Sequence, residues 1–323
     1  MIPLFYIKNQ KAIYLTLRFH KSRNLHLRFT GKGTGALLVP SQLHYNSQDK
    51  SKKVKIIIIL QYYFIKKNSN RPASSRLVMT SIKIANLNCI QVLTGPESSP
   101  TNLGVLLMHG YGADPSQFTE ITKILLSLQP SLDSKRIRWI FPSSPTQDGP
   151  VGSEWFPLDM MGWMGAFMGG DLAAKLRETP GGIVTATEQI INLLGELIST
   201  TDGAGSTLNG WCIGGFSQGS MMTCSVLSRL PLTKSPLTDV QIKAREIFKG
   251  VTSPGGALIL SGMPMDINSW AAGFQFHQGK NVEVLQLHGQ SDMVIPFHSS
   301  AWLRDLLKTH MNVKYHTHSG KTK

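Results

Sequence analysis

The sequence predicts an α/β fold over residues 79–323, with a mostly parallel β-sheet and helices on both faces. Short apolar runs of strand length alternate in this part of the chain with longer segments of helical spacing, which is typical of βαβ units. Apolar residues make up 41% of the 323 residues and charged residues 16%, a composition that can supply a globular core.

The first half of this fold is predicted from three apolar runs and two helical segments. The strands are expected in KIANLNCIQVL (83–93), in GVLLMHGYG (104–112), which ends in a glycine-rich turn, and in RIRWIFPSSP (136–145), which prolines end. Apolar residues three and four apart predict a helix over 115–130. A second helix is expected over 185–200, with Thr185 as its N-cap and Glu188 three residues on.

The second half continues the alternation. Strands are expected at NGWCIGGFS (209–217), GALILSG (256–262), VEVLQLHG (282–289) and NVKYHTH (312–318). Helices are expected at SMMTCSVLSRL (220–230) and SSAWLRDLLKTH (299–310). The long connection at 231–250 is interpreted as an insertion.

The excess positive charge lies in residues 1–78. This segment holds 15 of the 33 Lys and Arg residues and one acidic residue, Asp49, whereas 79–323 holds 18 of each sign. Its longest apolar run, 56–65, is short of the roughly 20 residues that span a bilayer. An organelle transit segment and a functional basic tail stay open. We favour a segment that is disordered or outside the native product, with translation starting at Met79.

The three cysteines, Cys89, Cys212 and Cys224, have no CxxC spacing. An odd count without such spacing argues against a disulfide framework and against a zinc site. It favours a reducing compartment, and we expect the cytoplasm.

The stretch GGFSQGS (214–220) contains the pattern G-x-S-x-G, centred on Ser217. A strand-like run precedes this pattern and a helical segment follows it. Small residues two before and two after a serine let the strand and helix pass closely while the serine is held out on a strained turn. The pattern therefore predicts a nucleophile at Ser217, although a plain strand-to-helix turn has the same local sequence.

At this point the chain resembles a known family, the phospholipase/carboxylesterase family of α/β-hydrolases, which includes acyl-protein thioesterases and bacterial carboxylesterases. The resemblance covers roughly 104–320 and rests on LLMHGYGAD, IRWIFPSSP, EWFPLD, GGFSQGS and VLQLHGQSDMVIP, in that order. The combination of GFSQG with a later HGxxDxVxP is specific to this group.

Asp292 is the candidate acid, because it follows the end of a predicted strand and the order Ser, Asp, His is that of α/β-hydrolases. A helix cap or turn residue is the alternative. The backbone N–H of Gln218, next to the nucleophile, is one expected oxyanion donor. The resemblance implies that the second is the backbone N–H of Tyr111, and that His109 and His288 shape their loops.

The resemblance also makes Trp155 a candidate substrate-binding residue. The stretch that follows, MMGWMGAFMGG (160–170), is rich in methionine, which suits surfaces that accept varied apolar ligands. A lid over an acyl channel and a flexible apolar loop packed on the body are both open.

The sequence has no histidine at the position where this family has its catalytic base. His298, His310, His316 and His318 are the histidines after Asp292. The family's histidine slot falls at Lys321 or Lys323, and a lysine with a pKa of about 10.4 is a poor base at neutral pH. His318, on the last predicted strand, is the candidate substitute. We expect a domain that lacks its final helix and is apparently truncated at its C-terminal part.

We therefore expect a serine hydrolase that cleaves carboxylic esters or thioesters through an acyl-enzyme, with no metal and no organic cofactor. By resemblance, the activity is that of an acyl-protein thioesterase, a lysophospholipase or a carboxylesterase, acting on acyl esters or S-acylated proteins. We expect no nucleic-acid partner and at most peripheral membrane contact; the oligomeric state stays open. The alternative is an inactive α/β-hydrolase fold that binds an acyl ligand or a partner because the base is missing.

Overall fold

The protein was analysed as a computed structural model, which describes residues 13–19, 25–31, 36–39, 77–149, 152–230, 242, 246–248, 253–279 and 282–319. Within the first 76 residues these are three strands, β1 (Ile13–Phe19), β2 (Leu25–Gly31) and β3 (Ala36–Val39), which pair antiparallel in that order. The rest of 1–76, and most of the insertion expected at 231–250, lie outside the described residues. The division of the chain at residue 78 stays a prediction.

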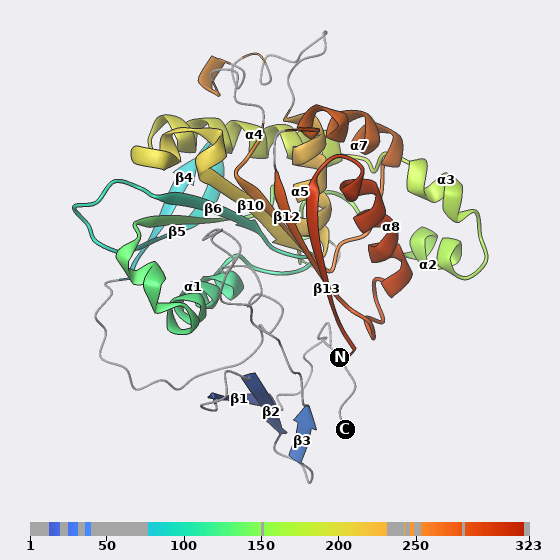
Figure 1. Ribbon diagram of the computed structural model, residues 1–323. Coiled ribbons are helices and arrows are strands. Elements are labelled where there is room, and N and C mark those ends of the chain that lie inside the picture. Colours follow the sequence, from blue (N-terminus) through green and yellow to red (C-terminus); the bar gives the residue numbers. More distant parts are fainter. Residues whose placement is uncertain are drawn as a thin grey trace.

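An eight-stranded sheet forms the centre of the molecule, in the order β13-β12-β11-β10-β6-β7-β5-β4 (Figure 1). Its strands are β4 (Val78–Ile84), β5 (Leu87–Thr94), β6 (Leu103–Met108), β7 (Ile137–Pro142), β10 (Trp211–Phe216), β11 (Gly256–Leu260), β12 (Glu283–Gly289) and β13 (Asn312–His318). All neighbours from β13 to β7 are parallel, and the two antiparallel pairs are β7 with β5 and β5 with β4, so that β5 is the strand that runs opposite to the rest. The prediction of a mostly parallel sheet is confirmed.

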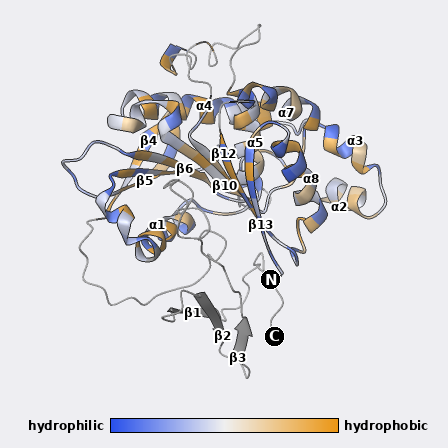
Figure 2. Cartoon of the chain, in the orientation of Figure 1, coloured by the Kyte–Doolittle hydropathy of each residue, from blue (hydrophilic) through white to orange (hydrophobic). Residues whose placement is uncertain are grey.

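Helices cover both faces of this sheet (Figure 1). One face carries α1 (Ser116–Leu128), whose Ile121 and Leu125 share an apolar cluster with Val105 and Leu107 of β6. The other face carries α4 (Ile183–Ser199), α5 (Gln218–Arg229), α7 (Ile267–Phe274) and α8 (Phe297–Lys308). Alternate residues of β6 enter the two clusters, as the pleat of a strand requires. Hydrophobic residues accordingly run along β6 and β10 (Figure 2).

Two sequence-based expectations about these elements are wrong. The first expected strand, 83–93, is a hairpin: β4 and β5 meet at a turn in which Ala85 and Asn86 have φ of 49° and 63°. Left-handed values at both turn residues match the twist of a two-residue hairpin. The second is the cap of α4, which is Gly182 with φ of 80°, so that Thr185 lies inside the helix.

The methionine-rich segment contains the short helix α2 (Met160–Phe167) and is followed by a second short helix, α3 (Leu172–Arg177); both lie beside α8 (Figure 1). Each begins at an aspartate whose carboxylate accepts from a backbone N–H of the first turn: Asp159 from Gly162, and Asp171 from Ala174. Residues 160–167 of the methionine-rich segment are therefore helical, and the lid over an acyl channel stays a prediction. The smaller elements are β8 (Thr146–Gly149), β9 (Gly152–Glu154), η3 (Pro130–Ser134), η4 (Gly203–Ser206), η5 (Leu208–Gly210) and η6 (Gln275–His277).

Candidate active site

Ser217 lies on the turn between β10 and α5, at the carboxyl end of the middle of the sheet. Its backbone has φ of 53° and ψ of −116°, a conformation that non-glycine residues rarely adopt. Such strain costs on the order of 1–3 kcal/mol and persists only where the surroundings impose it. Here the Ser217 N–H donates to Leu260 O at 2.8 Å, and Ser217 O accepts from Ser220 N–H at 2.9 Å. The strand β11 and the first turn of α5 therefore hold the serine in place.

The two glycines of the pattern are needed because strand and helix touch at this turn. A Cβ on Gly215 would lie 2.2 Å from the carbonyl carbon of Gly219, and one on Gly219 would lie 2.2 Å from Met108 O. Contacts this short require the backbone to move. The steric reason for the spacing, inferred from the sequence, agrees with the structure.

Ser220 is a residue of this turn that sequence reasoning missed. Its hydroxyl is buried and lies 2.7 Å from Gly215 O and 2.6 Å from Leu260 O, and it accepts from Leu260 N–H at 2.8 Å. One side chain thus joins β10, α5 and β11 beneath the nucleophile. The only signal in the sequence was its place in the first turn of the helix.

The turn after β6 lies against Ser217. A Cβ on Gly110 would be 3.4 Å from the Cβ of Ser217, which brings the next residue, Tyr111, to the serine. Among the described residues, no hydrogen-bond acceptor is found for the backbone N–H of Tyr111 or for that of Gln218. Unoccupied N–H groups beside a nucleophile are what an oxyanion site requires.

The side chain of Gln218 ties the serine turn to the segment around Trp155. It is buried, its Oε1 accepts from Trp155 N–H at 2.9 Å, and its Nε2 donates to Phe156 O at 2.7 Å. The indole N–H of Trp155 donates to His109 O at 2.9 Å. The ring of Trp155 is only 2% exposed, so the structure places this candidate substrate-binding residue as an internal anchor of the turn.

His109 shapes the turn after β6 through both ring nitrogens. Its Nδ1 donates to Gly110 O at 2.8 Å, and its Nε2 accepts from Ser144 N–H at 3.1 Å, which fixes a neutral tautomer. Burial also lowers the pKa of His109, which favours the same neutral form. Because both ring nitrogens are hydrogen-bonded, His109 is not available as a base. This agrees with the loop-shaping role that the family resemblance implied.

Asp292 lies on the loop after β12, at the carboxyl ends of the parallel strands, where Ser217 also lies. Its Oδ1 accepts from the N–H groups of Val294 and Ile295 at 2.9 and 3.0 Å. Its Oδ2 is 3.7 Å from His288 Nε2, which donates to Ile295 O at 2.9 Å instead. Asp292 can therefore be both a turn residue and a catalytic acid. Its Oδ1 stabilises the loop, and its Oδ2 can accept a hydrogen bond from a base.

The chain leaves β13 beside this loop. His318 pairs with Gly289, its carbonyl oxygen accepts from Gln290 N–H at 2.7 Å, and Ser291 Oγ donates to Ser319 O at 3.0 Å. His318 is half-buried, and burial lowers its pKa. The expected slots at Lys321 and Lys323 lie outside the described residues.

The other histidines are placed less favourably. His298 is exposed in the first turn of α8, with its ring 6.0 Å from that of Phe167 and 5.0 Å from that of Trp302. His310 follows α8 and lies just before β13 begins, near the amino ends of the parallel strands, whereas Ser217 lies at their carboxyl ends. His316 is exposed on β13, opposite Leu287 and two residues short of the carboxyl end.

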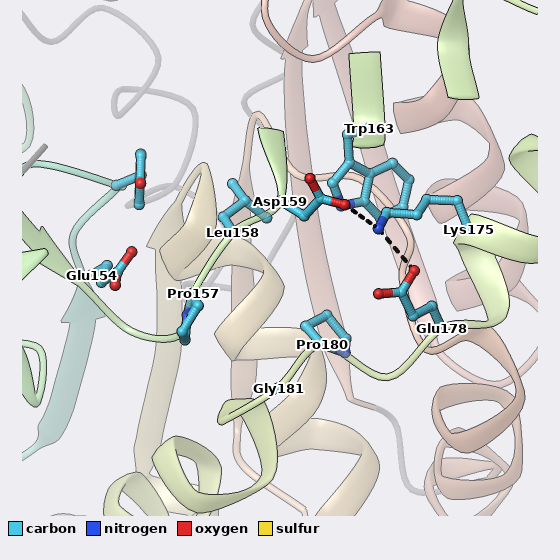
Figure 3. Close-up of a pocket in the computed structure, with 10 residues that line it drawn as sticks. Glu154, Pro157, Leu158, Asp159, Trp163, Lys175, Glu178, Pro180 and Gly181 are labelled. Atoms are coloured by element: carbon cyan, nitrogen blue, oxygen red, sulfur yellow. Dashed lines mark hydrogen bonds and ion pairs between the residues drawn. The ribbon is translucent and has the colours of Figure 1, made fainter. Parts of the chain in front are cut away.

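A pocket of about 310 Å³ opens between the segment that carries Glu154 to Trp163 and the segment that carries Lys175 to Gly181 (Figure 3). It is lined by Tyr111, Glu154, Pro157, Leu158, Asp159, Trp163, Lys175, Glu178, Pro180 and Gly181. Tyr111 is itself a candidate oxyanion donor, and Glu154 precedes Trp155, which is bonded to Gln218. This end of the pocket is therefore next to the two candidate oxyanion donors. Its walls combine apolar side chains with the phenol of Tyr111 and the four charged side chains of Glu154, Asp159, Lys175 and Glu178.

The remaining chemistry of the described residues is limited. Burial raises the pKa of Cys89 to about 12 and also raises that of Cys224, so neither is a reactive thiol at neutral pH. In the described part of the chain, no group of three side chains suited to a metal ion is found. The helices described there include none that combines the length and apolar character of a membrane span.

Comparison with known proteins agrees with this geometry. Residues 90–237 match the family model described as Phospholipase/Carboxylesterase. The matched segment contains Tyr111, Trp155, Ser217 and Gln218, whereas Asp292 lies beyond it. No match is found among curated proteins.

Several solved structures are similar in outline. Esterase PE8 is 21% identical, with a TM-score of 0.49, over 76% of this chain and 90% of that one. A carboxylesterase from Mesorhizobium loti is 14% identical, with a TM-score of 0.45, over 76% and 90%. SOBER1 from Arabidopsis thaliana is 19% identical, with a TM-score of 0.42, over 68% and 89%.

Proposed function

Because the chain belongs to the phospholipase/carboxylesterase family of α/β-hydrolases, we propose that it is a serine hydrolase that cleaves carboxylic esters or thioesters with Ser217 as its nucleophile. The observation that carries this proposal is the strained backbone of Ser217 beside two backbone N–H groups, of Tyr111 and Gln218, for which the described residues supply no acceptor.

The proposed reaction has two steps. Ser217 Oγ attacks the acyl carbonyl carbon while a base removes its proton, and the N–H groups of Tyr111 and Gln218 stabilise the negative oxygen. The leaving alcohol or thiol takes the proton, which leaves an acyl-enzyme. Water, activated by the same base, then releases the carboxylic acid and restores Ser217.

We assign the acid role to Asp292 and place the base at the end of β13, with His318 as the candidate among the described residues. The support for this placement is the pair of hydrogen bonds that hold residues 318–319 against the Asp292 loop. A histidine there would be oriented by the open oxygen of Asp292. The three groups would then follow the carboxyl ends of β10, β12 and β13.

The finer assignments are part of the same proposal. The substrates we favour are acyl esters, including lysophospholipids, and S-acylated proteins. The thiols of Cys89 and Cys224, which form no disulfide, suit a reducing compartment such as the cytoplasm. We take residues 79–323 as the hydrolase domain and 1–78 as an extension that hydrolysis does not need. The placement of Met79 within β4 fits a domain that begins near that residue.

A second candidate function is an inactive fold that binds acyl groups. The observation that favours it is that His288, which lies on the strand leading to the Asp292 loop, donates to Ile295 O and stays 3.7 Å from Asp292 Oδ2. The pocket would remain usable for binding in that case.

The experiment that separates the two candidates is labelling of the purified chain with a fluorophosphonate, which phosphonylates activated serines with loss of fluoride. We expect stoichiometric label on the peptide that contains Ser217, located by mass spectrometry. Ser217→Ala should remove the label, and Ser206→Ala, at an exposed serine of η4, should retain it. Absence of label from the wild-type chain would refute the hydrolase and leave the binding protein.

A further inference from the structure

Lys175, on α3, is the centre of an ion network at the pocket. Its ammonium lies 2.8 Å from Asp159 Oδ2 and 2.8 Å from Glu178 Oε2. It also sits over the ring of Trp163, 5.9 Å from the ring centroid. The Lys175 side chain is 14% exposed, whereas those of Asp159 and Glu178 are 58% and 54% exposed. The cation is thus enclosed by the pocket and the two carboxylates face water.

The network stands at one end of the pocket. Figure 3 shows Glu154 on one side and Lys175, with its two carboxylates, on the opposite side, while Pro157, Leu158 and Pro180 lie between them. The Glu154 end is the end next to the serine, because Trp155 N–H is bonded to Gln218. The pocket therefore leads from the serine turn along an apolar middle to a charged wall.

We propose that Lys175 determines substrate specificity by limiting the length of the acyl group that the pocket accepts. This inference rests on the proposed hydrolase function of Ser217. An acyl chain bound at the serine would lie along Pro157, Leu158 and Pro180 and end at the ammonium of Lys175. Medium-length acyl groups fit this space, and longer ones meet the network.

The physical reason is the cost of bringing methylene groups against charges. An acyl chain that reached Lys175 would bring methylene groups against the enclosed ammonium and would offer it no hydrogen bond. It would also have to separate Lys175 from the face of Trp163, where the ring favours a cation. The apolar middle of the pocket, by contrast, gains from each methylene it covers.

The network also joins the two helices over the pocket, so its role in specificity must be separated from a structural one. Asp159 caps α2, and this cap bond to Gly162 N–H does not depend on Lys175. Lys175→Met keeps most of the stem, removes the charge and leaves two carboxylates that remain hydrated. A variant that only loosened the helices would lower the turnover of all esters alike.

The test is the kcat/KM of aryl esters with acyl chains of 4, 8 and 12 carbons for the wild type, Lys175→Met and Lys123→Met. Lys123 is the matched control, since it forms an ion pair with Glu120 on the surface of α1, away from the pocket. We expect the wild type and Lys123→Met to turn over the 12-carbon ester least. Lys175→Met should raise the ratio of 12-carbon to 8-carbon kcat/KM by about tenfold or more.

A binding measurement makes the result independent of catalysis. Equilibrium dialysis measures the affinity of Ser217→Ala, with and without Lys175→Met, for 1-octanol and 1-dodecanol. The ratio of the two affinities shows which chain length the pocket accepts in the absence of hydrolysis. If no ester is hydrolysed but Lys175→Met still tightens dodecanol binding about tenfold relative to octanol, the hydrolase proposal fails and the length limit stands.

Three results would overturn the inference. The first is a folded Lys175→Met variant whose ester ratio and alcohol ratio both equal those of the wild type. The second is a wild-type chain that already prefers the 12-carbon ester. The third is an equal shift in Lys123→Met. If Lys175→Met does not fold, Lys175→Ala, which also removes the stem, is measured in the same way and should show the larger shift.

Discussion

The nucleophile side and the acid–base side of the candidate site are built differently. Ser217 ends a strand in the middle of the sheet, is 8% exposed, and is held by hydrogen bonds to β11 and to its own helix. Asp292 follows β12, next to the edge strand β13, and its neighbour Met293 is 89% exposed. The middle of the sheet fixes the nucleophile through backbone geometry, whereas the edge supplies the acid and base through a loop.

This difference explains why the nucleophile can be predicted from one short stretch of sequence, whereas the base cannot. The serine turn needs a glycine at 215, a glycine at 219 and a strand-to-helix transition, all within a few residues. The acid–base side depends on how two loops meet at the end of β12 and β13. Their meeting is fixed by bonds such as that between Gln290 N–H and His318 O, which join distant parts of the chain.

The largest expected effect is on the acid side. Asp292→Asn should lower kcat by about 10³–10⁴, because an amide neither orients nor stabilises a charged base as a carboxylate does. The free energy of unfolding should change by less than about 1 kcal/mol, since Asn can still accept from the N–H groups of Val294 and Ile295. Ester turnover and urea unfolding measure the two quantities. A variant with more than a tenth of the wild-type rate would place the acid elsewhere.

The serine side should respond in the opposite way, with a loss of stability. Gly219→Ala puts a Cβ 2.2 Å from Met108 O, so the helix must move away from the strand. We expect a loss of about 3 kcal/mol in urea unfolding, at the upper end for overpacked sites, together with loss of ester hydrolysis. Gly165→Ala on α2 is the control, because nothing lies within 4 Å of its Cβ. It should be neutral or slightly stabilising; similar midpoints for the two variants would contradict the close contact.

The smallest effect is a pH dependence of stability on the serine side. Protonation of His109 would place a proton on Nε2, which accepts from Ser144 N–H. Burial lowers the pKa of His109 in the folded state below the ordinary value of about 6.5. The unfolded chain therefore binds the proton first. Stability should be full above pH 6.5 and fall below it, by at most about 1.4 kcal/mol per pH unit for this residue, until the folded-state pKa is reached.

Urea midpoints at pH 7.5, 6.5 and 5.5 check this expectation. His288, whose pKa burial also lowers, contributes in the same direction, so His109→Asn should reduce the slope without removing it. Asn can donate and accept at this position, which makes it the conservative variant. An unchanged slope would mean that His109 does not report on the folding of the serine turn.

Much of the fold was predictable because strands and helices in this chain follow apolar spacing. The strands β6, β7, β10, β11, β12 and β13 lie where their apolar runs are, within a few residues. The hairpin at Ala85 and Asn86 was missed because its turn lacks the usual glycine. The helix α2 was not predicted because the run 160–168 is apolar on all sides and has no helical period; the cap at Asp159 makes it a helix.

Within the candidate site, sequence reasoning predicted Ser217, Asp292 and the two backbone donors, but not the contacts that the structure shows around them. The bonds of Gln218 to Trp155 N–H and Phe156 O join positions more than 60 residues apart. The network of Lys175 depends on how α2 and α3 fold back on each other. No local pattern encodes contacts of this kind, and such contacts shape the pocket.

The central claim is that Ser217 acts as a nucleophile, and hydrolysis of a medium-chain aryl ester by the wild-type chain, measured beside Ser217→Ala, tests it most directly. We predict that the wild type exceeds the alanine variant by at least about a thousandfold, since the serine and its base act as a unit. Equal rates for two folded proteins would contradict the claim, and the pocket would then serve binding without cleavage.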